Sequence, residues 1–265
     1  VAAGGLKACA WADLLQGTAL IAGGALVVYF AMQALGIATA ETIPALAATN
    51  LPDSATALQK FTALNANKLH MVLPASDPAI PWTALVIGLW IPNFYYWGLN
   101  QYITQRTLGA KSLGEGQKGI VFAAALKLII PFIIVVPGII AFNLFSGDMK
   151  REATTDNRAG LELFQSVKSK PAEAKVAFVF TGNFAEVEPA LARELVAFNS
   201  AVAGVPVPAE ASLDAANEAA LRAIAQKNAS GAGISLQKPF IGYKYDSAFA
   251  LLIKKLIPTG LRGFM

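Results

Sequence analysis

Charge and cysteine are both scarce in this sequence. Only 14% of its residues are charged and its mean hydropathy is +0.51, which is too apolar for an ordinary soluble domain. Its one cysteine, Cys9, excludes a disulfide within the chain and a zinc site built from several cysteines. The net charge of +4 is small, and the basic residues do not cluster with aromatic ones as in nucleic-acid-binding proteins. The composition therefore favours a membrane protein that has no nucleic-acid partner.

Three long stretches lack charge almost completely. No charged residue occurs in 14–40 or 78–105, and 119–147 contains only Lys127. Each stretch is long enough to cross about 30 Å of hydrocarbon as a helix, which takes about 20 residues. The runs are continuously apolar and lack the alternation of barrel strands. The sequence therefore predicts an all-α integral membrane protein with three transmembrane helices in the lipid bilayer.

Loop charges predict the orientation of these helices. Residues 106–118 carry three basic residues against one acidic residue, whereas 41–80 carries two basic against three acidic residues. Because short basic loops remain in the cytoplasm, we expect a multi-pass protein of the cell membrane with 106–118 cytoplasmic and 41–80 extracytoplasmic. The first helix and its cytoplasmic lead-in would then occupy 1–40, the second helix 81–105 and the third 119–146.

The stretch 147–245 has an ordinary soluble composition, and we expect it to form a mixed, mainly helical extracytoplasmic insert. Apolar residues recur at helical spacing over 187–202. Pro189 stands near the start of this predicted helix and Gly204 follows its end, as helix boundaries prefer. The other elements predicted in the insert are a helix over 212–226, a short strand over 175–180 and a linker or turn over 204–210.

The second predicted transmembrane helix is unusually polar. It contains IPNFYYWGLNQYITQR, residues 91–106. Pro92 lacks a backbone N–H, so we expect a kink or break there, and broken helices at membrane depth line enclosed cavities. Asn93, Tyr96 and Trp97 are spaced i, i+3 and i+4 and share one face. Tyr and Trp also form belts at the membrane surface, but these residues lie near the middle of the span.

Lys127 is the one charge within the third predicted helix. It lies eight residues into the span, about 12 Å deep, where a lysine costs several kcal/mol unless it is paired, hydrated or able to snorkel. Because the second and third helices are antiparallel neighbours, Lys127 can meet the face of Asn93, Tyr96 and Trp97. These side chains suit a polyhydroxylated ring, since aromatic faces stack on C–H surfaces while amide and ammonium groups bind hydroxyls.

Asp13 begins the first predicted helix, in the stretch WADLLQG. One interpretation is an acidic residue that the helix dipole favours near an N-terminus. The other is a carboxylate at the inner mouth of a cation pathway. Neither a nucleophile–base pair nor a metal-binding cluster is visible, so we expect no catalytic residues and no enzyme activity.

Three stretches resemble a known family. They are GGLKACAWADLLQG (4–17), GLWIPNFYYWGLNQYITQRTLGAKSLGEGQKGIVFAAALKLIIPFIIVVPGIIAF (88–142) and LIPTGLRGF (256–264). The chain closely resembles the sodium/solute symporter family, in particular its sodium/sugar branch of the glucose and galactose type. The resemblance covers residues 4–40, 80–146 and 246–265.

The resemblance implies a fold. Members of the family have an inverted-repeat helical bundle of the leucine-transporter type, of which this chain would be an internal fragment truncated at both ends. Residues 1–40 would supply the fifth core helix, 81–105 the broken sixth helix and 119–146 the seventh. Residues 246–265 would approach the eighth helix, and 147–245 lies outside the resemblance.

The resemblance also implies a function. The protein would transport a sugar, a hexose such as glucose or galactose, together with sodium by alternating access. Sodium would be the co-transported ion, bound outside this fragment, and no cofactor is implied. Asn93 and Lys127 would bind sugar hydroxyls, Tyr96 would stack on the pyranose ring as an inner gate, and Trp97 would pack beside it. Asp13 matches an acidic residue near the inner cation exit.

Two features depart from the family pattern. Ala12 stands where the family often has a hydroxyl-bearing residue, and the segment 147–245 is longer than expected. The residues leave open another solute on the same scaffold, such as inositol, a nucleoside or an organic acid. They also leave open a membrane sensor with 147–245 as its ligand domain.

Overall fold

The computed structural model of the chain has two compact units. The first, called the helical unit here, comprises Val1–Leu144 and Leu251–Met265, and the second, called the insert unit, comprises Phe145–Ala250. The residues that the structure describes are 4–52, 54–70, 72–75, 80–207 and 211–263. The architecture is mostly helical, in agreement with the expected all-α class.

Two helices are long and apolar enough to cross a membrane. They are α1, Gly5–Ile37, from its residue Lys7 onwards, and α5, Leu113–Val167. The dihedral angles of Phe145, φ −128° and ψ 22°, interrupt α5, and the helical unit ends beside this residue. The uninterrupted part of α5 before Phe145 therefore corresponds to the predicted third span, and α1 corresponds to the first.

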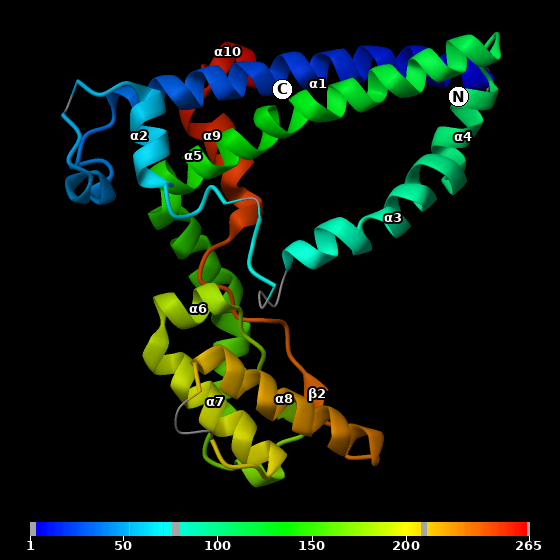
Figure 1. Ribbon diagram of the computed structural model, residues 1–265. Coiled ribbons are helices and arrows are strands. Elements are labelled where there is room, and N and C mark those ends of the chain that lie inside the picture. Colours follow the sequence, from blue (N-terminus) through cyan, green and yellow to red (C-terminus); the bar gives the residue numbers. More distant parts are fainter. Residues whose placement is uncertain (1–3, 53, 71, 76–79, 208–210, 264–265) are drawn as a thin grey trace. The chain divides into compact units, whose positions relative to one another are not determined.

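Helices α1 and α5 pack closely where they cross (Figure 1). Gly23 and Gly24 are buried, and a Cβ on Gly24 would lie 2.3 Å from Ile133 Cγ2. With any larger residue the Ile133 side chain or one of the two helices would have to shift, because real Cβ atoms do not approach other carbon atoms this closely. The glycine pair thus allows close helix packing, as in other membrane helices with small residues at their contacts.

The predicted second span is not one continuous α-helix. It consists of π-helical turn η2 (Ala84–Gly88), helix α3 (Trp90–Phe94), π-helical turn η3 (Tyr95–Leu99) and helix α4 (Gln101–Leu108). Two backbone hydrogen bonds join residues i and i−5, as in a π-helix. Leu89 N donates to Ala84 O at 3.1 Å, and Asn100 N donates to Tyr95 O at 2.9 Å. Such π-turns disturb the regular helical ladder.

The sequence predicted a kink or break at Pro92, and one irregularity lies in the turn just before it, where the π-turn η2 ends at Gly88 and Leu89 separates it from α3. A second irregularity lies further on. Pro92 is part of α3, and helical dihedral angles continue through Phe94 and Tyr95. The residue that leaves the helical region is Asn100, with ψ 114°. Pro92 has no N–H to donate to the carbonyl of Gly88, four residues earlier, so the disturbance that it causes lies in the preceding turn rather than at Pro92 itself.

The segment between the first two predicted spans contacts the end of α1. It contains the 3-10 helix η1 (Pro44–Ala48) and helix α2 (Ala57–Leu64), which begins with a capping box at Thr56. Lys60 is only 3% exposed, and its Nζ donates to Gly36 O at 2.7 Å and to Ala38 O at 2.8 Å. This ammonium group satisfies carbonyls at the C-terminus of α1, where a positive charge is favoured.

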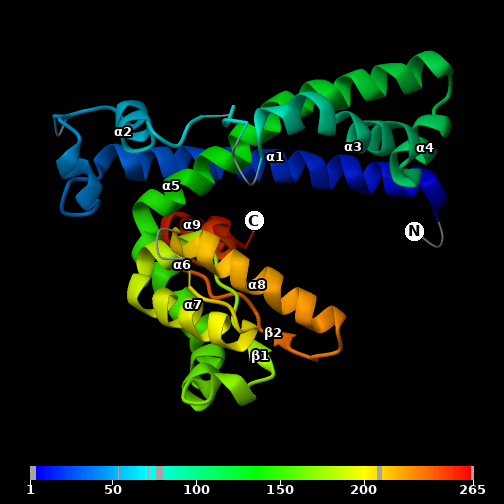
Figure 2. The same ribbon diagram turned by 60° about the horizontal axis from the view of Figure 1, so that its bottom comes forward.

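The insert unit has its own hydrophobic core, to which α7 (Pro189–Ala203) and α8 (Leu213–Ala229) contribute buried side chains. Figure 2 shows these two helices side by side. The elements of this unit after α5 are η4 (Pro171–Glu173), β1 (Val176–Ala177), α6 (Gly182–Val187), α7 (Pro189–Ala203), α8 (Leu213–Ala229), β2 (Ser235–Leu236) and η5 (Tyr245–Ser247). Strands β1 and β2 pair in parallel, with Val176 opposite Ser235. The chain continues into α9 (Ala248–Leu256) and α10 (Thr259–Arg262).

The predictions for the insert agree with these elements in part. The helix predicted over 187–202 is α7, which ends at Gly204 with φ 69°. The helix predicted over 212–226 is α8, with Ser212 as its N-cap. The strand predicted over 175–180 is real but shorter, as β1. Of the predicted turn over 204–210, residues 208–210 lie outside the described residues.

Three asparagine side chains hold separated segments of the insert unit together. Each asparagine side chain bonds both backbone groups of one partner residue. Its Nδ2 donates to the partner's carbonyl and its Oδ1 accepts from the partner's N–H, which are the bonds that a neighbouring strand would make. The pairs are Asn157 with Ile241, Asn199 with Phe178, and Asn228 with Ile234. Buried backbone groups are thereby satisfied without a long strand.

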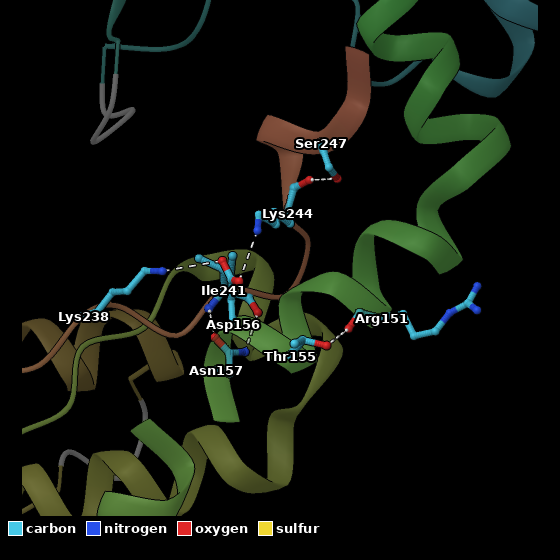
Figure 3. A network of polar contacts seen from close by, with 8 residues as sticks. All are labelled: Arg151, Thr155, Asp156, Asn157, Lys238, Ile241, Lys244 and Ser247. Atoms are coloured by element: carbon cyan, nitrogen blue, oxygen red, sulfur yellow. Dashed lines mark hydrogen bonds and ion pairs between the residues drawn. The ribbon is translucent and has the colours of Figure 1, made fainter. Parts of the chain in front are cut away.

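The first and last segments of the insert unit contact each other, and Figure 3 shows the ion pair between Asp156 and Lys244 that joins them. Lys244 N donates to Met149 O at 3.2 Å, and Lys244 Nζ lies 3.1 Å from Asp156 Oδ1. Lys238 Nζ lies 3.5 Å from the other oxygen of Asp156. The hydrogen bond from Lys244 lowers the pKa of the Asp156 carboxyl group below its ordinary value. The chain therefore enters and leaves this unit at adjacent points.

Candidate solute site

Two adjacent aromatic residues of η3 form a corner. The rings of Tyr96 and Trp97 lie 5.5 Å apart between centroids and at 84° to each other. Tyr96 is 40% exposed and Trp97 is half-buried. Because the rings are nearly perpendicular, they present two aromatic walls, and we call this arrangement the aromatic corner.

Lys127 of α5 reaches the aromatic corner. Its Nζ lies 3.9 Å from the ring centroid of Tyr96 and 4.7 Å from that of Trp97. Both distances are within the range of a cation–π interaction, which stabilises by about 0.5–2 kcal/mol depending on exposure. The structure thus brings together three of the four residues that the sequence predicted to form a solute site.

A cavity of about 390 Å³ adjoins these three residues. Tyr96, Trp97 and Lys127 line it, and so do Arg106 and Glu115. Ligand cavities typically measure about 300–1,000 Å³ and combine apolar walls with a few polar groups. Its size and its aromatic and cationic walls therefore suit one small hydroxylated ring.

Asn93, the fourth predicted residue, lies apart from this cavity. Its Nδ2 donates to Leu89 O at 2.8 Å, one turn earlier along the helix, and it is not among the residues that line the cavity. The spacing placed it on one face with Tyr96 and Trp97. The π-turn over 95–99 alters this spacing, since it inserts an extra residue into the turn that carries both rings.

Asp13 makes an ion pair that sequence reasoning missed. Its Oδ2 accepts a hydrogen bond from Arg106 Nη2, and the Arg106 guanidinium carbon lies 3.5 Å from the ring centroid of Tyr102. Arg106 Nε is buried and has no hydrogen-bond partner within the described part of the chain. The i, i+4 spacing of Tyr102 and Arg106 indicates that these two side chains can meet on one helix face, but no sequence signal points from Arg106 to Asp13, 93 residues away.

A metal centre is not visible in the part of the chain that the structure describes. No group of three or more His, Cys, Asp or Glu side chains is placed there to hold a metal ion. Cys9 is a free, half-buried cysteine near the start of α1. The cavity presents aromatic faces, an ammonium and a guanidinium group, which can stack on a solute and donate hydrogen bonds to it.

Comparison with known proteins gives matches to one family of transporters. The family model described as "Sodium:solute symporter family" matches residues 1–163. The sodium/glucose cotransporter of Vibrio parahaemolyticus is 42% identical over 147 residues, which is 54% of this chain and 25% of that protein. An uncharacterized symporter of Escherichia coli K12 is 38% identical over 142 residues, 54% of this chain and 22% of that protein.

A mammalian relative has a different named solute. The sodium/myo-inositol cotransporter of Mus musculus is 31% identical over 155 residues, 55% of this chain and 21% of that protein. The chain thus spans about a quarter of the length of the curated relatives that it matches. No solved structure matches the chain significantly.

Proposed function

This chain belongs to the sodium:solute symporter family, and from that premise we propose that it acts in sodium-coupled uptake of a sugar. The family consists of transporters, so the activity would be a cycle of binding and conformational change without covalent chemistry. A hexose such as glucose or galactose is the proposed solute and sodium the co-transported ion. The sodium/glucose cotransporter of Vibrio parahaemolyticus, at 42% identity, supports this choice of solute.

The aromatic corner with Lys127 is the observation that carries the proposal. A pyranose ring has an apolar C–H face and a rim of hydroxyls. The face would stack on Tyr96 beside Trp97, while the ammonium of Lys127 would donate to a hydroxyl oxygen. The cavity of about 390 Å³ has room for one such ring.

Asn93 is proposed as a further solute contact. Its amide now bonds to Leu89 O, a bond of the kind that helical residues exchange readily with other acceptors. It lies three residues before Tyr96, between the two π-turns. A rearrangement of those turns during transport would bring it towards the cavity, where its amide could donate to a sugar hydroxyl.

The proposed cycle is alternating access in an inverted-repeat bundle of the leucine-transporter type. We place 106–118 in the cytoplasm, and 41–80 and 147–245 outside it, because basic residues are concentrated in 106–118. Asp13 would then lie at the inner end of the cation pathway. A sodium ion that reaches Asp13 would compete with Arg106 for the carboxylate.

Uptake of labelled galactose tests the proposal directly. The carrier that contains this chain is reconstituted in vesicles, and uptake is compared under a sodium gradient and under an equal potassium gradient. We expect uptake only with sodium. Sodium-independent uptake, or no uptake of any hexose by correctly inserted protein, would contradict the proposal.

A pair of tyrosine variants tests the assigned site. Tyr96→Ala should reduce sodium-driven uptake at least about tenfold, equivalent to the loss of about 1.4 kcal/mol of binding. Tyr95→Ala is the matched control, because Tyr95 is 60% exposed and does not line the cavity. Equal uptake by the two variants would contradict the role of the aromatic corner.

A cyclic polyol is the second candidate solute. Three relatives at 31–32% identity are named sodium/myo-inositol cotransporters. Inositol offers the same combination of a C–H face and a rim of hydroxyls as a pyranose. Unlabelled myo-inositol should then inhibit galactose uptake more strongly than galactose itself, and this order of inhibition would favour inositol as the solute.

A further inference from the structure

Lys127 lies against the aromatic face that a solute would use. Its Nζ lies over the ring of Tyr96 at 3.9 Å from the centroid and close to that of Trp97 at 4.7 Å. A sugar ring that stacks on Tyr96 needs the same face at a similar distance, because stacked groups lie about 3.5–4 Å apart. The ammonium and the solute cannot both occupy that face.

No other group in the described residues competes with the rings for Lys127. The one carboxylate that lines the same cavity, Glu115, is paired with Lys118 at 3.2 Å. Within the residues that the structure describes, no carboxylate oxygen lies within 4.0 Å of Lys127 Nζ. The two aromatic faces are therefore the protein groups that contact this charge. Lys127 and Tyr96 are both exposed, so the attraction belongs to the lower part of the range of about 0.5–2 kcal/mol.

We propose that Lys127 is a tethered ligand of the aromatic corner: its ammonium occupies the faces of Tyr96 and Trp97 while the carrier is empty, and a solute binds by displacing it. This proposal rests on the assignment of the cavity as the solute site. The new element is that the Lys127 ammonium and the solute compete for the same aromatic faces. When the solute binds, the ammonium leaves the rings and donates a hydrogen bond to the solute.

This competition selects the class of solute. A displaced ammonium loses its contact with the rings and needs a new acceptor, because an unpaired charge at this depth is costly. A ring with hydroxyl or carboxylate oxygens on its edge supplies one. A hydrocarbon ring of the same size does not, so it would stack less favourably than the ammonium that it replaces. Lys127 would thus reject apolar rings while it admits polyols.

Tetramethylammonium is a direct probe of the corner. It has no hydrogen-bond donor and spreads its charge over methyl groups, so aromatic faces are its natural site in proteins. Binding of labelled tetramethylammonium is measured on the purified carrier that contains this chain, in wild type and in Lys127→Ala. We expect Lys127→Ala to bind it at least about tenfold more tightly than wild type does, because the corner is then vacant.

Two controls restrict this result to the corner. Lys111→Ala also removes a lysine from the helical unit, but Lys111 is exposed and does not line the cavity, so this variant should bind the probe as wild type does. The double variant Tyr96→Leu with Lys127→Ala should lose the gain. In Lys127→Ala, galactose and tetramethylammonium should exclude each other.

The opposite result would overturn the proposal. If Lys127→Ala inserts normally and melts at the wild-type temperature but binds the probe no more tightly than wild type, the ammonium does not occupy the corner. Lys127→Ser, which keeps a short polar side chain, provides the same measurement if the alanine variant does not insert. Wild-type carrier that takes up no sugar while Lys127→Ala gains the probe would overturn the proposed sugar transport alone.

Discussion

At the residue scale, the ion pair between Asp13 and Arg106 joins positions 93 residues apart. Both side chains are partly exposed, at 31% for Arg106 and 41% for Asp13. The pair is therefore expected to contribute less than a fully buried one, although the ring of Tyr102 covers one face of the guanidinium group.

A double-mutant cycle measures this pair. We expect Asp13→Asn and Arg106→Gln to show a coupling free energy of about 0.5–1 kcal/mol in thermal unfolding of the carrier. Glu115 and Lys118 provide the control cycle, because their side chains are more exposed, at 58% and 77%, and their coupling should be smaller. Additive effects at Asp13 and Arg106 would show that the pair does not form in the membrane.

Asp156 gives the insert unit a dependence on pH. Its pKa is lowered from the ordinary 3.8, first by the hydrogen bond from Lys244. A lowered pKa in the folded state means that the ionised form stabilises the fold. This stabilisation is fully present above about pH 4 and is lost as the pH falls through the folded-state pKa.

Pepsin cleavage tests this dependence. It is compared at pH values from about 5 down to about 2, a range that includes the pKa of a carboxyl group. We expect the segment 238–247 to become susceptible as the pH falls, and Asp156→Asn to be susceptible already at pH 5. Glu162→Gln, an exposed position on the same helix, is the control. Equal cleavage profiles for the wild type and Asp156→Asn would contradict the role of this carboxylate.

At the element scale, the contact of α1 with α5 depends on Gly24. Gly24→Ala should lower the stability of the carrier by about 1–3 kcal/mol, because the added methyl group overlaps Ile133 Cγ2. Gly17→Ala is a matched control in the same helix, since nothing lies within 4 Å of its Cβ position. Thermal unfolding in detergent measures both variants.

A compensating substitution makes this prediction specific. Ile133→Ala removes the overlapping methyl groups, so the double variant with Gly24→Ala should be more stable than Gly24→Ala alone. A double variant that is no more stable than Gly24→Ala would mean that the two helices do not cross at this point.

At the scale of the whole molecule, the adjacent ends of the insert unit allow its removal. Met149 O and Lys244 N are 3.2 Å apart, so a short Gly-Ser turn can replace 150–243 without stretching the chain. We expect the shortened carrier to retain sodium-driven uptake, because the residues that line the candidate solute site all lie within 96–127. Normal insertion with no uptake would show that this unit takes part in the transport cycle.

Local physics made several elements predictable from the sequence. The charge-free runs identified α1 and the first part of α5, because hydrocarbon excludes charge whatever the neighbouring helices are. Pro189 and Gly204 marked the ends of α7, because their backbone preferences act within a single turn. Lys127 was recognisable as exceptional because it is the one charged residue in the apolar run 119–147.

Tertiary structure decided how distant segments meet. The partner of Asp13 lies 93 residues away, and the amide of Asn157 bonds to a backbone 84 residues further on. Three other features were also not predictable from sequence spacing: the pairing of β1 with β2, the departure from helix at Asn100, and the position of Lys127 over the rings. Sequence spacing describes neighbours within one element, whereas these contacts depend on which surfaces pack together. That choice is made by the burial and hydrogen bonding of the whole fold.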